Sequence, residues 1–133
     1  MNAPGETDVD KMLADLSVER RPGVFTFVAV RVPTPGLLAA AHAMVEEGEL
    51  TTLVVPIDAA ERAGLPVTVE MAWLTLAVQS SLEAVGLTAV VAQRLTAIDV
   101  PCNVLAGYHH DHLLVPVDRA DDAVAALVRD RAG

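Results

Sequence analysis

A short motif occurs twice in this chain, sixty positions apart. Residues 55–61 read Val-Pro-Ile-Asp-Ala-Ala-Glu, and residues 115–121 read Val-Pro-Val-Asp-Arg-Ala-Asp. In both copies an apolar, β-rich stretch ends at proline, and an aspartate then opens a helical pattern. A glycine precedes each copy, Gly48 and Gly107, where a β-hairpin would turn. The repeat therefore predicts an internal duplication, with each half of the chain built as strand, connection, hairpin and helix.

Length and composition agree with two small units that share an aliphatic core. The chain has 133 residues, of which 53% are hydrophobic and only 3% aromatic. A unit of half this length buries its own sheet poorly, so two units are expected to pack together. We expect a short tail over residues 1–7, a first unit with an N-terminal helix over 8–66, and a second unit over 67–133.

Hydrophobic periodicity and turn residues place the elements within these units. Arg21-Pro22-Gly23 is expected to separate an opening helix from the first strand, and residues 37–47 fit either a helix or a strand paired across Gly48. Asp58 and Asp118 are expected to cap helices, and Gly64 to end the first of them. The remaining expectations are helices over 8–16 and 87–98 and strands over 24–32, 50–55, 71–79, 102–106 and 112–117.

Charge and cysteine content exclude several classes of protein. The formal net charge of −9 repels phosphate, so we expect no nucleic-acid partner. A single cysteine, Cys102, cannot form an internal disulfide, which fits a reducing compartment. Residues 1–10 are polar and acidic, unlike a signal peptide, and no apolar run is long enough to cross a bilayer. We therefore expect a cytoplasmic protein with no membrane partner.

Two segments of the second half resemble a known family. Residues 80–89 read Ser-Ser-Leu-Glu-Ala-Val-Gly-Leu-Thr-Ala, and residues 102–116 read Cys-Asn-Val-Leu-Ala-Gly-Tyr-His-His-Asp-His-Leu-Leu-Val-Pro. They are similar to small stand-alone bacterial proteins with two tandem ACT-like domains, and residues 5–8 and 47–56 agree more loosely. The resemblance implies an α+β fold of ferredoxin-like βαββαβ units in tandem, with antiparallel sheets and helices on one face. It also implies amino-acid binding and regulation of a separate protein.

The connection from strand to helix over residues 79–88 is the first candidate ligand site. Unpaired N–H groups at a helix start attract a carboxylate, and glycine lets the backbone approach a ligand closely. By the resemblance, Gly86 occupies the glycine position of this turn. The alternative is that a serine caps the helix and Gly86 relieves a tight turn. The candidate contacts are Ser80, Ser81, Leu82, Val85, Gly86 and Leu87.

The sequence His109-His110-Asp111-His112 is the second candidate site. Its side chains are of metal-ligand type, but neighbours on a strand point to opposite faces, so at most two converge on one ion. Hydrogen bonding to a ligand or at an interface is the stronger interpretation, with His110 and His112 as candidates, and a solvent-exposed tip is the alternative. Asn103 could bind a ligand's amino or carboxyl group from the neighbouring strand or stabilise a bulge. Imidazoles would make any binding sensitive to pH.

Few residues suggest catalysis. Neither Ser80 nor Ser81 lies in a nucleophile elbow, and Cys102 fits a small buried strand residue. We expect a non-catalytic module without cofactor or bound metal, which holds an amino acid between its units or across a homodimer interface. One alternative is a ligand-free interaction or oligomerisation module whose sheet edges pair with a partner, including a separate enzyme. Another is a metal-dependent enzyme that uses residues 109–112.

Overall fold

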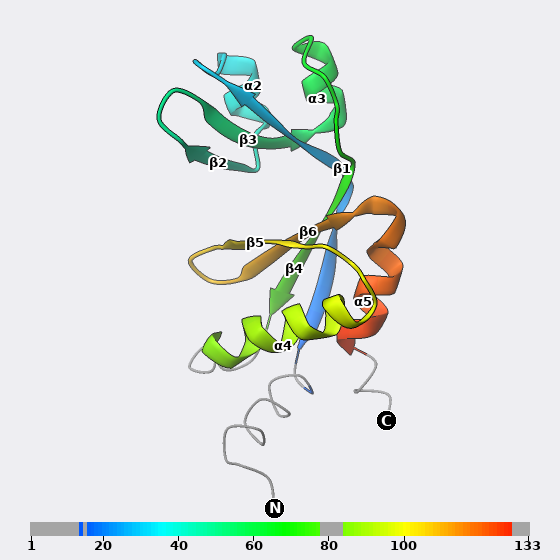
Figure 1. Ribbon diagram of the computed structural model, residues 1–133. Coiled ribbons are helices and arrows are strands. Elements are labelled where there is room, and N and C mark those ends of the chain that lie inside the picture. The colour runs from blue at the N-terminus through cyan, green and yellow to red at the C-terminus, as the bar shows by residue number, and fades with distance from the viewer. Residues whose placement is uncertain (1–13, 15, 78–83, 129–133) are drawn as a thin grey trace, which may run out of the picture. The chain divides into compact units, whose positions relative to one another are not determined.

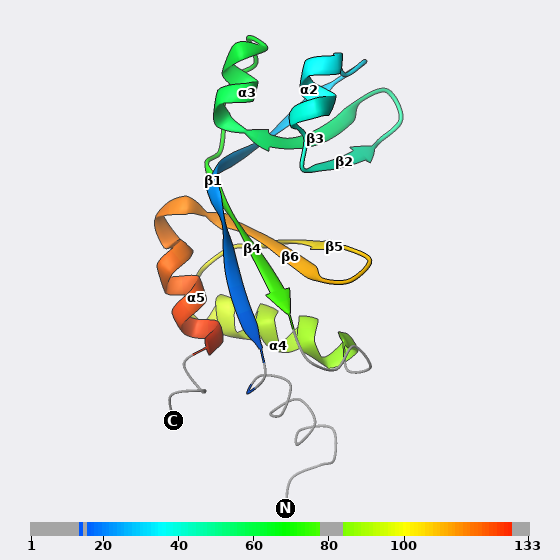
Figure 2. The same ribbon diagram turned by 180° about the vertical axis from the view of Figure 1, so that it is seen from behind.

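The computed structural model describes residues 14, 16–77 and 84–128 and has an α+β fold (Figures 1 and 2). Hydrogen bonding links six strands in the order β2-β3-β1-β4-β6-β5. The elements are β1 (Ser17–Val30), α2 (Pro35–Ala40), β2 (Ala43–Glu46), β3 (Thr51–Pro56), α3 (Ile57–Arg62), β4 (Met71–Ala77), α4 (Ala84–Ala97), β5 (Asn103–Ala106), β6 (Asp111–Pro116), the 3-10 turn η2 (Val117–Arg119) and α5 (Ala120–Val128). Among the described residues, no helix is both long and apolar enough to span a membrane.

The chain divides into two compact units, and the division does not follow the order of the sequence. The N-terminal unit comprises Pro22–Ala72. The C-terminal unit combines the described residues up to Arg21 with those from Trp73 onward. Strand β1 therefore contributes its opening residues to the C-terminal unit and its remainder to the N-terminal unit. The repeat in the sequence does not predict this sharing of one strand.

The N-terminal unit is built on three antiparallel strands with both helices on one side (Figures 1 and 2). Thr34 caps α2, because its Oγ1 accepts a hydrogen bond from the Leu37 amide at 3.2 Å, and Pro35 follows at the first helical position. The ambiguous residues 37–47 thus contain both the end of a helix and strand β2. The core of the unit joins residues from β1, β3 and the two helices: Val28, Leu37, Leu53, Val55, Ala59 and Ala60.

Strand β1 differs from its prediction. The strand was expected to start at residue 24, after a break at Arg21-Pro22-Gly23, but it runs unbroken from Ser17. Gly23 makes this possible, because its φ of +103° is a conformation that few other residues adopt. The predicted helix over 8–16 lies almost entirely outside the described residues. At its end, Leu16 is fully buried and is not helical.

The two copies of the repeat adopt nearly the same local structure. Pro56 and Pro116 each end a strand and occupy the N-cap position, and neither makes a side-chain cap hydrogen bond. The expectation that Asp58 and Asp118 would be the caps is wrong. Each lies in the first turn instead, where its negative charge interacts favourably with the positive end of the helix dipole. Gly64 follows the end of α3 with φ +73°, as predicted for a helix stop.

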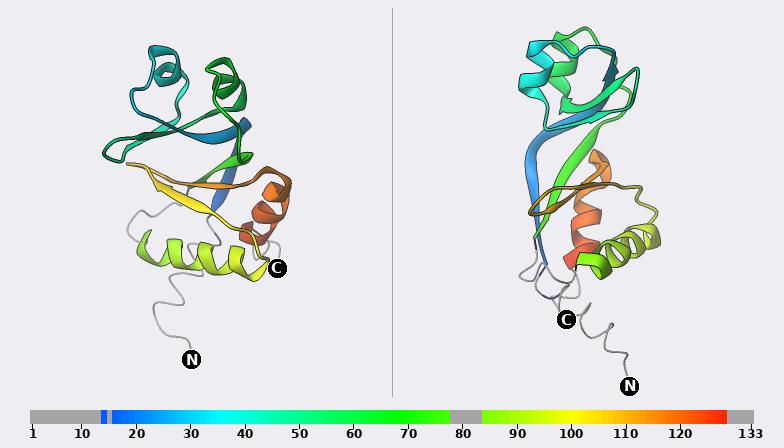
Figure 3. Two further views of the ribbon diagram at one scale, coloured as in Figure 1. Left: turned by 45° about the horizontal axis from the view of Figure 1, so that its top comes forward. Right: turned by 90° about the vertical axis from the view of Figure 1, so that its left-hand side faces the viewer.

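In the C-terminal unit, α4 and α5 lie on the same side of β1 and β4 (Figure 3). The two helices contact each other, and Arg94 Nη1 donates a 3.3 Å hydrogen bond to the Ala126 carbonyl. In the helix predicted over 87–98, Leu87, Val91 and Leu95 are buried as expected, whereas Ile98 lies just after α4 and is half-buried. Strands β5 and β6 form the predicted hairpin, with Asn103 opposite Leu114 and Leu105 opposite His112.

Candidate functional site

Part of the first candidate site lies outside the described residues, namely Ser80, Ser81 and Leu82. The rest lies in the first turn of α4, which runs from Ala84. Gly86 is therefore a helical residue and not part of a tight turn, contrary to the expectation. Leu87 is buried. Helix α4 also contains Val85, and ligand contact by any of these residues stays a prediction.

The second candidate site contains a compact polar cluster, which we call the His112 cluster and which consists of Trp73, Thr75 and His112. The indole Nε1 of Trp73 donates to Thr75 Oγ1 at 3.2 Å and to His112 Nδ1 at 3.3 Å. Thr75 Oγ1 lies 3.0 Å from His112 Nδ1, and the two ring centroids are 5.2 Å apart. The three residues come from the neighbouring strands β4 and β6, so the cluster links the centre of the C-terminal unit's sheet.

The hydrogen bonds fix the protonation state of His112. The Trp73 indole nitrogen can only donate, so His112 Nδ1 must accept and cannot carry a proton. The Thr75 hydroxyl accepts from Trp73 and is free to donate its own proton to the same Nδ1. The one N–H of Trp73 is shared between Thr75 Oγ1 and His112 Nδ1, and a neutral imidazole with its proton on Nε2 keeps the Nδ1 lone pair available to both donors. A second proton, on Nδ1, would face the Trp73 N–H and remove the hydrogen bond between the two rings, leaving Nδ1 only Thr75 Oγ1 as a partner in the cluster.

Burial and charge favour the same neutral form. Burial lowers the pKa of His112 first, followed by the positive charge of Arg21 and by His110, while Asp111 opposes the shift. The Arg21 guanidinium lies 4.2 Å from the centroid of the Trp73 ring, on which it stacks. The cluster therefore carries a cation beside a neutral imidazole. Elsewhere in the unit, burial raises the pKa of the Cys102 thiol, which makes that thiol a poor nucleophile at neutral pH.

Gly107 gives the hairpin its close approach to the His112 ring. A Cβ added at this position would lie 2.8 Å from the His110 carbonyl oxygen and 3.0 Å from His112 Nε2. The Gly107 amide donates to that same carbonyl oxygen at 2.9 Å. The turn after β5 is therefore tight enough to exclude a side chain, and the imidazole packs against its backbone. The sequence indicated Gly107 only as a hairpin residue.

The other predicted residues of this site are spread along the hairpin. Asn103 pairs with Leu114, and His112 pairs with Leu105. Residues two apart on a strand share a face, so Asn103 and His112 lie on the same face, but Asn103 lies at the opposite end of β5 from the turn. Asn103 and His110 are exposed, and His110 lies in the turn. Within residues 14, 16–77 and 84–128, no group of three histidine, cysteine or acidic side chains is arranged to hold a metal ion.

The His112 cluster lies near the end of the sheet where β4 leads toward α4. Strands β4 and β6 are neighbours in an antiparallel sheet, so the last residue of β4, Ala77, lies near the start of β6 at Asp111. Thr75 and His112 stand two residues and one residue from these ends and contact each other. The His112 cluster therefore lies at the end of β4 that precedes α4 in sequence.

Sequence reasoning missed Trp73 and Thr75 as members of the site. A tryptophan in an apolar strand is most simply a core residue, and the Trp73 side chain is indeed buried. The alternation of β4 contained a usable signal, because Trp73 and Thr75 share one face while Leu74 and Leu76 occupy the other. Thr75 is partly exposed, as expected of the face that α4 and α5 do not cover.

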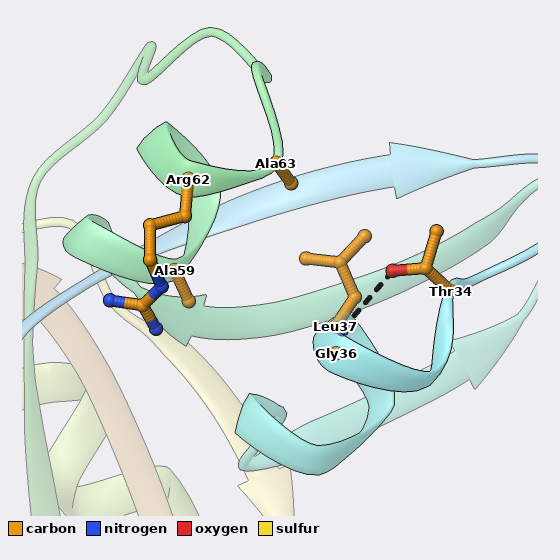
Figure 4. A pocket seen from close by; sticks show the side chains of 6 residues that line it. All are labelled: Thr34, Gly36, Leu37, Ala59, Arg62 and Ala63. Atoms are coloured by element: carbon orange, nitrogen blue, oxygen red, sulfur yellow. Dashed lines mark hydrogen bonds between the residues drawn. The ribbon is translucent and has the colours of Figure 1, made fainter.

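The N-terminal unit has a hollow near the connection from β1 to α2. The hollow has a volume of about 220 Å³ and lies between α2 and α3 (Figure 4). Among the described residues that line it, the charged one is Arg62, which makes a 3.0 Å ion pair with Asp58. The lining residues are Thr34, Gly36, Leu37, Ala59, Arg62 and Ala63. The space is largely apolar and differs in chemistry from the His112 cluster.

Comparison with known proteins relates both halves of the chain to one family. Two family models, each described as an ACT domain, match residues 4–72 and residues 68–129. No curated protein matches the chain. A Vibrio cholerae protein of unknown function, described as a possible transport protein, is 34% identical, with a TM-score of 0.86 and coverage of 96% of this chain and 98% of that one.

More distant structures share the fold alone. A protein from Agrobacterium tumefaciens is 14% identical, with a TM-score of 0.65 and coverage of 87% of this chain and 89% of that one. The regulatory subunit of aspartate kinase from Thermus thermophilus, in a ligand-free form, is 12% identical, with a TM-score of 0.58. There the similarity covers 86% of this chain and 95% of the subunit.

Proposed function

Because the chain belongs to the ACT domain family and contains two such domains in tandem, we propose that it is a non-catalytic regulatory module that binds an amino acid. ACT domains commonly bind small ligands such as amino acids. The Thermus thermophilus protein of the same fold is a regulatory subunit almost wholly covered by this chain. A chain of this extent can therefore serve as a separate regulator. We propose that the present chain acts in this way on a separate enzyme, as a homodimer.

The His112 cluster is the observation that carries the binding proposal. A zwitterionic amino acid needs a donor or cation for its carboxylate and acceptors for its ammonium group. Arg21, stacked on Trp73, supplies the cation, and His112 keeps an N–H on Nε2. Asp111 and Asn103 are the acceptors that the same hairpin offers, with Asp111 next to His112 in sequence but on the other face of β6, and Asn103 at the start of β5. All four belong to strands of the C-terminal unit.

The charge of the whole protein also favours a zwitterion. A formal net charge of −9 opposes the approach of any ligand with a net negative charge. A zwitterion has no net charge, so local groups decide whether it binds. We therefore expect neutral amino acids to bind more tightly than aspartate or glutamate.

Thermal unfolding in the presence of each of the twenty amino acids tests the proposal. A ligand at a hundred times its Kd adds about 2.7 kcal/mol to the stability, which corresponds to a rise in Tm of roughly 10 °C for a chain of this size. We expect one amino acid, or a small chemically related group, to raise the Tm. His112→Ala removes the rise, whereas His109→Ala, a change at the exposed tip, keeps it.

Two results would reject amino-acid binding at this site. One is a Tm unchanged by all twenty amino acids at millimolar concentration. The other is a rise in Tm of the same size in wild type and in the His112→Ala variant. Calorimetric titration of the same variants separates loss of binding from loss of folding, because it measures heat in protein that is still native.

A further inference from the structure

The edge of the sheet in the N-terminal unit carries exposed side chains, some apolar and some acidic. Strand β2 is the first strand in the order of the sheet, and only β3 pairs with it among the described strands. Met44 and Val45 on β2 are 52% and 49% exposed, and Leu50 beyond the turn is 45% exposed. We call this surface, residues 43–50, the β2 edge. Exposed apolar residues grouped in this way are typical of an interaction surface.

The backbone of β2 is oriented to accept another strand. The Glu47 amide donates to the Leu50 carbonyl at 2.8 Å, so residue 47 faces β3. Antiparallel pairing alternates along a strand, so Val45 also faces β3, while the N–H and C=O groups of Met44 and Glu46 face outward. These outward groups match the hydrogen-bonding pattern of an extended peptide that adds to the edge.

The charges around this edge determine which partner it fits. Glu46, Glu47 and Glu49 are all exposed there, and residues 32–61 contain no lysine or arginine. Arg31 follows β1 and is separated from β2 by β3. A second copy of this chain, docked on the same surface about a two-fold axis, would bring its glutamates against these ones. Like charges facing each other disfavour that pairing.

A hollow beside the β2–β3 hairpin indicates which kind of side chain the partner would place there. It has a volume of about 360 Å³ and combines the acids Glu47 and Glu49 with apolar groups. Glu47 is held in place by a hydrogen bond from the Thr52 hydroxyl. A long side chain with an apolar stem and a cationic head, such as lysine or arginine, matches both features. The lining residues are Ala29, Glu47, Glu49, Leu50 and Thr52.

We propose that the β2 edge docks an extended segment of a partner protein that alternates apolar and basic residues. The segment adds a strand to β2, packs its apolar side chains on the face that contains Met44, and places a lysine or arginine on the opposite face, beside Val45 and Glu47. This proposal goes beyond ligand binding and does not depend on it. The following experiment contains no amino acid, so the two proposals fail independently.

Nuclear magnetic resonance titration with a designed peptide tests the β2 edge. The probe is a capped peptide of about eight residues that alternates valine and lysine, because alternate side chains of a strand share a face. We expect it to shift the backbone amide signals of residues 43–50 in a saturable way. A peptide that alternates valine and glutamate binds at least about tenfold more weakly. A valine–lysine peptide with every second amide methylated, which cannot add to a strand, also loses binding.

Matched charge variants distinguish the β2 edge from general attraction to an acidic protein. Glu46→Lys with Glu49→Lys changes the edge, whereas Glu61→Lys with Glu70→Lys changes exposed positions elsewhere in the same unit. Each exchange adds two charge units, so either pair moves the formal net charge from −9 to −5. We expect the edge pair to lose at least about tenfold in affinity and the control pair to change by less than about threefold.

Three results would overturn the proposal. The first is a valine–lysine peptide that causes no shift in residues 43–50. The second is equal loss of affinity in the two pairs of variants, which would mean non-specific electrostatic binding. The third is unchanged binding of the methylated peptide, which would show that no strand is added.

Discussion

Replacing Gly107 with alanine tests the packing of the hairpin against the His112 ring. The new Cβ would lie 2.8 Å from the His110 carbonyl oxygen, closer than real Cβ contacts come, and 3.0 Å from His112 Nε2. The imidazole can rotate away, but the carbonyl belongs to the backbone of the same tight turn. Relief therefore requires the turn to open and to weaken the 2.9 Å hydrogen bond between the Gly107 amide and that carbonyl.

The expected cost follows from these contacts. Overpacking against backbone costs about 1–3 kcal/mol, and loss of the hydrogen bond is contained in that range. For a chain of this length the loss corresponds to a fall in Tm of roughly 4–12 °C. Equilibrium unfolding in urea measures it, and the fluorescence of the single tryptophan, Trp73, reports on the cluster itself.

Gly36→Ala is the matched control, because the same chemical change meets different surroundings. A Cβ at Gly36 has nothing within 4 Å, and the residue lies in helix α2. Restricting the unfolded chain there should stabilise the protein by about 0.5 kcal/mol. The two variants are therefore expected to change stability in opposite directions. Equal effects, or a Gly107→Ala variant as stable as wild type, would refute the close packing of the hairpin.

Two further predictions concern buried polar groups. Thr26 Oγ1 is buried without a hydrogen-bond partner in the described part of the chain, so Thr26→Val should raise the free energy of unfolding by about 1 kcal/mol. Thr75→Val removes a bonded hydroxyl and should lower the free energy of unfolding by a similar amount. Urea unfolding that ranks the two variants the other way would contradict this. The lowered pKa of His112 means that its contribution to stability is complete above the unfolded pKa of 6.5 and is lost as the pH falls through the folded value below it. His112→Asn keeps an acceptor near the Nδ1 position but does not titrate. From about pH 7.5 to about pH 5.5, wild type should therefore lose more stability than this variant. Parallel pH profiles of the two proteins would exclude a contribution of His112 titration to stability.

The repeat predicted much of the fold because its residues act through local interactions. Proline cannot continue a strand ladder and is well suited to begin a helix, so Pro56 and Pro116 end strands in both units as expected. The same rules failed at Arg21-Pro22-Gly23. There the long-range pairing of β1 within the sheet outweighs the local tendency to break the strand, because β1 pairs with β3 over Phe25–Val30 and neighbours β4 on its other side. Gly23 permits the strand to continue, but a glycine in the sequence does not by itself predict that it will.

The candidate site was predicted only in part for a similar reason. Asn103 and His112 were placed on one hairpin correctly, since a hairpin is local. The contact between Trp73 and His112 joins residues 39 positions apart and depends on the order of strands in the sheet. An aromatic residue in a buried strand is usually part of the core, so nothing in the local sequence indicated that the Trp73 N–H bonds to an imidazole.

The most direct test of amino-acid binding at the His112 cluster is a fluorescence titration of Trp73. The indole donates to His112 and lies beneath Arg21, so a ligand that binds these residues must change its surroundings. We predict a saturable change in Trp73 emission with the amino acid that stabilises the protein, and no change with that amino acid in the His112→Ala variant. Thermal stabilisation by an amino acid with unchanged Trp73 emission would contradict binding at this cluster.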